Sequence, residues 1–201
     1  MTLLALFGIS GFAFVLVVLL ARGRPTEGVA TRVDGPWSDF CEAHGLMIQP
    51  ASGLLGEAWP MISGAVGGVR VDVDVRDDRY AGRTPWTRVT ATAIVSTRGV
   101  LRVEARNGRS PTTGRAIRTG DAVFDGELRV YADDDAVVRL LDEAVRRALL
   151  DVASRHMLVL EIDAGRVTLT VPGVLSRVDE LDAAVRAAVA CARARESVGY
   201  R

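Results

Sequence analysis

Lysine is absent from this chain, and its absence excludes several kinds of chemistry. All 25 basic residues are arginine. Schiff-base catalysis, the phosphate loop of nucleotide hydrolases and the kinase active site each require a lysine, so the sequence is incompatible with all three. Cysteine is scarce as well, because a chain with two cysteines cannot build a disulfide scaffold. The strand-to-helix motif G-x-S-x-G, which presents a nucleophilic serine, is also missing.

The chain has no excess charge of either sign, since 25 acidic residues balance the 25 arginines. A generally basic surface is therefore missing, and we predict no nucleic-acid partner. A hydrophobic share of 49% with 25% charged residues excludes a disordered chain. A length of 201 residues fits one domain with a short appendage.

Residues 3–21 form an uncharged apolar run at the N-terminal side. Nineteen helical residues extend about 28 Å, close to the thickness of the hydrocarbon layer of a bilayer. A cleaved signal peptide would have a basic start and a shorter apolar stretch, and a buried core helix is seldom apolar on every side. We therefore predict an uncleaved transmembrane anchor over residues 1–24.

Arg22 and Arg24 follow this run directly, and no basic side chain precedes it. Because positive charge tends to stay in the cytoplasm, we predict a single-pass protein of the bacterial inner membrane with its domain on the cytoplasmic side. Cys41 and Cys191 suit that reducing compartment if their thiols are free.

Residues 25–35 are predicted to be a linker, and residues 36–201 a single α+β domain. A short helix is expected from Pro36 to the glycine at position 45. Strands are expected over residues 59–66, 69–76, 87–96, 100–106 and 128–132, and a strand hairpin over 158–171. Residues 133–154 and the segment after Ser176 have the periodicity of amphipathic helices. Half-polar strands and short turns predict a mainly antiparallel sheet with helices on one face.

Residues 124–141 resemble a bacterial family of membrane-anchored domains of unknown function. In that family a Phe-Asp pair leads into a strand, an acidic step and a helix with an arginine and paired leucines. The matching positions are Phe124, Asp125, Val130, Tyr131, Ala132, Asp134, Arg139 and Leu141. Leu128 departs from the pattern, which has an aromatic residue there. The resemblance implies a membrane-tethered domain and supplies no catalytic residues.

Three groups of residues suggest metal or acid–base chemistry, and each has a simpler explanation. Cys41 and His44 have a C-x-x-H spacing, but a structural zinc site needs four ligands, and these residues suit a core position and a helix end. Asp72 and Asp74 share one face of a strand, where neighbouring arginines favour a solvated charge ladder. The three aspartates at 133–135 precede a helix and suit its cap. We therefore predict no metal, no cofactor and no catalytic residues.

Residues 106–118 are the most distinctive polar segment, with four arginines and no acidic residue. Guanidinium groups bind phosphate and carboxylate in a forked geometry, so this segment is a candidate anion site. Its candidate ligands are Arg106, Arg109, Arg115 and Arg118. Arg79, Arg83 and Arg88 around Trp86 form a second, aromatic-bearing cluster that could join it. The alternative is that both segments are solvated loops.

Three hypotheses for function follow. The first is a non-enzymatic interaction domain held at the inner face of the membrane, with an unidentified protein partner bound by Trp59, Trp86 and Tyr131. The second is an anion-binding module that uses residues 106–118 to bind an anionic lipid headgroup or a phosphorylated ligand. The third is a hydrolytic or redox enzyme, which would need a cleft with at least two titratable groups of shifted pKa.

Overall fold

The computed structural model describes residues 27–49, 59–76, 84–92, 99–106, 115–163 and 165–199, and it has an α+β fold. Its strands are β1 (Met47–Gln49), β2 (Met61–Val66), β3 (Val69–Arg76), β4 (Trp86–Thr92), β5 (Leu101–Ala105), β6 (Arg115–Ile117), β7 (Leu128–Ala132), β8 (Val159–Asp163) and β9 (Arg166–Pro172). Its helices are α2 (Glu27–His44), α3 (Ala122–Glu127), the 3₁₀ helix η2 (Asp135–Leu140), α4 (Glu143–Ala153) and α5 (Val178–Gly199).

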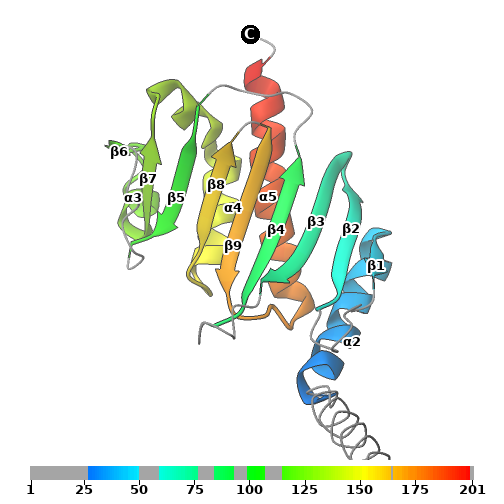
Figure 1. The fold of residues 1–201 in the computed structure, drawn as a ribbon. Helices are drawn as coiled ribbons and strands as arrows, with labels where there is room; N and C mark the ends of the chain where they lie inside the picture. Colours follow the sequence, from blue (N-terminus) through cyan, green and yellow to red (C-terminus); the bar gives the residue numbers. More distant parts are fainter. Residues whose placement is uncertain are drawn as a thin grey trace, which may run out of the picture.

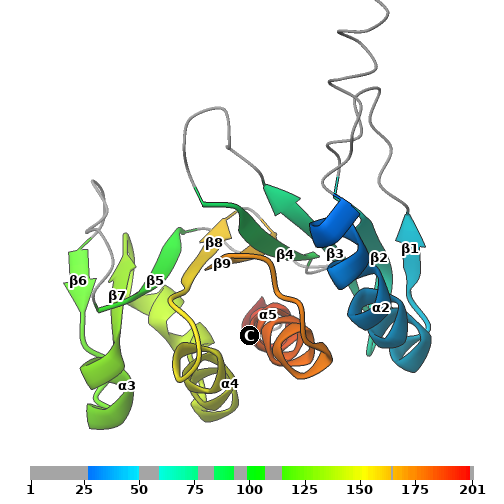
Figure 2. The same ribbon diagram turned by 90° about the horizontal axis from the view of Figure 1, so that it is seen from below.

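The nine strands form one antiparallel sheet in the order β1-β2-β3-β4-β9-β8-β5-β7-β6 (Figure 1). Figure 2 shows α2, α3, α4 and α5 beneath the same face of this sheet. The predicted α+β class with an antiparallel sheet is therefore confirmed. Within the described residues, no helix has the length and apolarity needed to cross a membrane, and the predicted anchor at residues 1–24 lies outside them.

Strand alternation explains the two faces of the sheet. In β3 the side chains of Val69, Val71 and Val73 are buried against the helices, while Arg70 and Asp72 point to the opposite face. We call that opposite face the open face. Because the same alternation holds in β4, β9 and β7, the core forms on the helix side only.

The C-terminal hairpin β8–β9 occupies the middle of the sheet. β4 and β5 follow one another along the chain but are not neighbours in the sheet, because β9 and β8 lie between them. The apolar positions of β8 and β9 alternate with polar ones and are buried on the helix side, as they are in β3 and β4. Local sequence does not encode this insertion.

Two helix predictions need correction. α2 begins at Glu27 and not at Pro36, so residues 27–35 are helical and Pro36 lies inside the helix. Its proline removes one backbone hydrogen bond, whereas the buried Trp37 and Phe40 pack the helix into the core and outweigh that loss. The predicted helix over 133–154 is divided into η2 and α4, because the carboxylate of Asp142 accepts the N–H of Val145 and starts a new helix there.

Two buried side chains fix the connection between β9 and α5. The hydroxyl of Thr87 accepts a hydrogen bond from the N–H of Leu175 at 2.9 Å and donates one to the carbonyl of Gly173 at 2.9 Å. The indole N–H of Trp37 donates to the carbonyl of Leu175 at 2.8 Å. Both polar groups of Leu175 are thus satisfied inside the core, which holds the start of α5 against α2 and β4.

Candidate functional site

A hollow of about 770 Å³ lies at the β6–β7 edge of the sheet, and we call it the edge hollow. The residues that line it come from the end of β5, from β6, from the loop before α3, from α3 and from β7: Arg106, Ala116, Ile117, Arg118, Gly120, Ala122, Asp125, Gly126, Leu128, Arg129, Val130 and Tyr131. Pockets for small organic ligands in proteins have volumes of about 300–1,000 Å³, so the edge hollow has the size for an organic anion.

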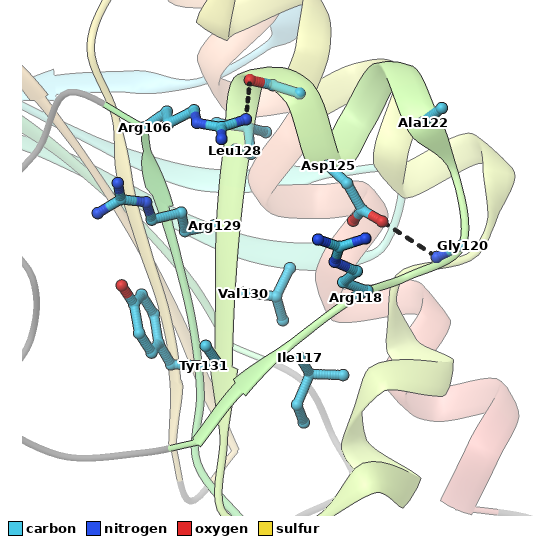
Figure 3. A pocket seen from close by; sticks show the side chains of 12 residues that line it. Arg106, Ile117, Arg118, Gly120, Ala122, Asp125, Leu128, Arg129, Val130 and Tyr131 are labelled. Atoms are coloured by element: carbon cyan, nitrogen blue, oxygen red, sulfur yellow. Dashed lines mark hydrogen bonds between the residues drawn. The ribbon is translucent and has the colours of Figure 1, made fainter.

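Arginines reach the edge hollow from both sides of β7. Figure 3 shows Arg106, Arg129 and Tyr131 on one side of this strand, and Arg118 with Asp125 on the other, next to the loop that leads into α3. All three arginines are exposed, and Arg106 also donates from Nη1 to the carbonyl of Gly126 at 3.3 Å. A ligand at the strand edge therefore meets guanidinium groups on two sides.

Asp125 fixes the loop that carries Arg118. Its Oδ1 accepts hydrogen bonds from the backbone N–H of Thr119 at 3.0 Å and from the Thr119 hydroxyl at 2.8 Å, and its Oδ2 accepts from the N–H of Gly120 at 3.2 Å. Gly120 has a φ of +85°, a conformation that glycine adopts without strain. The charge of Asp125 is thus used to order the wall of the hollow.

Asp121 joins the same wall to the helix layer. It caps α3 by accepting the N–H groups of Phe124 and Val123, both at 3.1 Å, and it receives Arg146 Nε at 3.2 Å. These bonds, with the N–H of Phe124 as the largest cause, hold the pKa of the Asp121 carboxyl below its usual value. Because Phe124 is fully buried, the short helix α3 is attached both by packing and by its cap.

Arg102 lies beside the hollow, but its guanidinium group contacts two glutamates. Its Nε is 3.4 Å from Oε2 of Glu104, and its Nη1 donates to Glu161 at 2.5 Å. Glu104 is buried at 1% exposure, and it is the register partner of Arg129. The open face next to the hollow is therefore a network of alternating charges.

The four predicted anion ligands do not all lie at the edge hollow. Arg106 and Arg118 line the edge hollow together, whereas Arg109 lies outside the described residues. Arg115 is exposed on β6 opposite Ala132 and does not line the hollow. The sequence analysis missed Arg129, although its alternation with Leu128 and Val130 marks it as an open-face residue.

The second predicted arginine cluster does not join the first. Arg79 and Arg83 lie outside the described residues, and Arg88 forms an ion pair with Asp74 on the neighbouring strand. In the sheet, β9, β8 and β5 separate β4, which carries Arg88, from β7. Four strand spacings amount to about 19 Å.

The same separation affects the three predicted partner-binding aromatics. Trp59, Trp86 and Tyr131 are all half-buried. Trp86 begins β4, while Tyr131 lies on β7 at the other side of the sheet, so these residues do not form one apolar patch. Tyr131 instead lines the edge hollow.

The residues considered for metal or acid–base chemistry make local contacts. Cys41 is buried, and His44 packs on Phe40 with its Nε2 at 3.3 Å from Asp182. The Oδ2 atom of Asp72 lies 3.4 Å from Nε of Arg70, as expected for a charge ladder. The aspartates at 133–135 stand at the start of η2, and the carboxylate of Asp133 accepts the N–H of Val100. Among the described residues, no cluster of three potential metal ligands occurs.

Comparison of the chain with protein-family models, with curated proteins and with solved structures gives no significant match. The resemblance of residues 124–141 to a membrane-anchored family stays a prediction.

Proposed function

We propose that the protein is a non-enzymatic anion-binding domain, tethered to the membrane, whose ligand is an organic phosphate or carboxylate bound in the edge hollow. The observation that carries this proposal is the position of Arg106, Arg118 and Arg129 around one hollow, on both sides of a strand edge. Guanidinium groups offer several N–H donors each and keep their charge at all physiological pH values.

The wall of the hollow supports this proposal. Asp125, the carboxylate among the lining residues, accepts three hydrogen bonds from its own loop and so orders the site. Tyr131 adds an aromatic ring and a hydroxyl at the same place. A bare inorganic anion would fill only a small part of about 770 Å³, which favours an anion that carries an organic group.

The membrane tether and the cytoplasmic location are part of the proposal. They rest on the uncharged run at residues 3–21 and on Arg22 and Arg24 behind it. Cys41 and Cys191 are both free and buried, which agrees with a reducing compartment. A protein-binding role through Trp59, Trp86 and Tyr131 is not favoured, because the fold separates Tyr131 from Trp86.

The test is the affinity of the full chain in detergent for inorganic phosphate and pyrophosphate, measured by titration calorimetry. Arg118→Gln removes one guanidinium without changing the fold, and we expect affinity to fall about tenfold, equal to about 1.4 kcal/mol. Arg166→Gln is the matched control, since Arg166 is an exposed arginine on β9, away from the hollow. Equal affinities for both variants and the wild type would contradict the proposal.

A further inference from the structure

Six strands place their termini at a common end of the sheet. The ladder pairs Arg76 with Trp86, Val159 with Thr170, and Ala105 with Leu128. Because the sheet is antiparallel, β4, β7 and β8 begin at this end while β3, β5 and β9 finish there. We call it the tether end, because the chain that leads from the proposed anchor enters the fold here.

The chain enters the described fold at this same end. β1 pairs with β2 so that Gln49 lies opposite Met61, which places the end of β1 at the tether end, while its start, Met47, lies opposite Ser63 near the middle of β2. α2 finishes at His44, just before β1, and its start lies toward the tether end, as Figure 1 shows. Its 18 residues extend about 27 Å, about the length of the sheet.

The sequence before α2 ties this end to the proposed membrane anchor. The uncharged run stops at position 21, and α2 begins at Glu27, which leaves the five residues 22–26 between them. Five residues reach at most about 18 Å when extended. An anchor at residues 3–21 therefore keeps the start of α2 within that distance of the bilayer surface, so that the tether end is the end of the sheet turned toward the bilayer.

The surface of the tether end has the composition of a membrane interface. Trp59 precedes β2 and Trp86 begins β4, and both are half-buried. Tryptophan favours the headgroup layer, where one side of the ring is apolar and the N–H meets water. Exposed apolar side chains occur at both ends of the sheet, so it is the two tryptophans that distinguish the tether end as a membrane-facing surface.

Three exposed arginines lie at the tether end: Arg76 at the end of β3, opposite Trp86, Arg177 before α5, and Arg106 after β5, three strands away from β4. The acidic Asp179 nearby is neutralised by Arg155 at 2.9 Å and Arg177 at 3.0 Å. Arginine side chains next to an anionic leaflet are attracted to lipid phosphates.

We propose that the tether end is a docking surface for an anionic lipid bilayer, with Trp59 and Trp86 in the headgroup layer and Arg76, Arg106 and Arg177 on lipid phosphates. The inference rests on the membrane tether of the proposed function. It also assigns a source to the anion of the edge hollow, because Arg106 belongs to both surfaces. The lipid headgroup is then the organic phosphate that the hollow binds.

The experiment uses the full chain reconstituted in vesicles of phosphatidylcholine, with or without phosphatidylglycerol, that contain a gadolinium-chelating lipid. A nitroxide is attached to Ser176→Cys at the tether end or to Thr92→Cys at the far end of β4, both exposed positions. Cys41 and Cys191 are buried, so labelling is directed to the introduced thiol.

We expect relaxation of the Ser176 label by gadolinium to exceed that of the Thr92 label severalfold in anionic vesicles. The double variant Arg76→Gln/Arg177→Gln, or high salt, should reduce the difference, whereas Arg166→Gln should not. Equal relaxation of the two labels, or stronger relaxation at Thr92, would overturn the docking surface.

The tether is tested separately by washing the vesicles with alkaline carbonate. A protein that stays with the vesicles supports the tether, and the label comparison then decides the orientation alone. A protein that is washed off overturns the tether, and with it this inference, while anion binding in the edge hollow is still measured by calorimetry in detergent.

Discussion

Asp125→Ala distinguishes an ordered binding site from a simple accumulation of positive charge. The substitution removes the acceptor of three hydrogen bonds, from the N–H and hydroxyl of Thr119 and from the N–H of Gly120. Charge alone predicts tighter anion binding, because a negative group near the arginines disappears. Loss of loop order predicts weaker binding, because Arg118 is no longer held.

The sizes of the lost electrostatic repulsion and of the cost of ordering the loop decide whether anion affinity rises or falls. One unit charge at about 7 Å in a water-like dielectric contributes about 0.6 kcal/mol. Reordering the two or three loop residues around Thr119 upon binding costs about 1–2 kcal/mol for each residue. The ordering cost is larger, so we expect anion affinity to fall about tenfold or more, although the variant has gained net positive charge.

The assay combines phosphate titration with urea unfolding of the same protein. We expect the free energy of unfolding to fall by about 2 kcal/mol, since two of the three hydrogen bonds are partly buried. Asp125→Asn should be intermediate, because its amide oxygen still accepts from Thr119 while its NH₂ group cannot accept from Gly120. Tighter phosphate binding by Asp125→Ala would refute the role given to this loop.

Two further predictions concern the core. Thr87→Val leaves the buried N–H of Leu175 without its acceptor, and we expect a loss of about 2 kcal/mol in urea unfolding, against little change for Thr90→Val on the open face. An equal effect of both variants would contradict the reasoning. Burial raises the pKa of the Cys191 thiol to about 12, so the unfolded chain ionises first. Stability is then fully present below the unfolded thiol pKa of about 8.5 and declines as pH rises from there toward 12. Cys191→Ala should flatten this decline, and an unchanged pH profile would show that the thiol is not its source.

Local pattern was sufficient for most of the sheet. The alternation of Val69, Val71 and Val73 with charged residues predicts β3 and its buried face, and the glycine turn at 67–68 predicts its hairpin with β2. α3 was missed, because six residues with Gly126 among them show no helical period. It is held by Phe124 in the core and by the cap of Asp121, which are tertiary and single-residue features.

The candidate site was predictable only in part, because strand order decides which arginines meet. Arg106 and Arg118 were predicted from the composition of one segment, and they do line one hollow. Arg129 reaches the same hollow because β7 pairs with both β5 and β6, and no local signal encodes that pairing. Trp86 and Tyr131 were grouped by residue type, yet the insertion of the hairpin β8–β9 between β4 and β5 separates them.

Anion binding in the edge hollow is tested most directly by titrating the full chain in detergent with inorganic phosphate while recording the backbone amide signals by NMR. The account predicts saturable shifts for Gly120, Gly126 and Arg129, which line the hollow, and none for Thr168 on the central strand β9. Shifts of equal size at Thr168 and at Gly120, or a response that never saturates, would contradict a specific anion site.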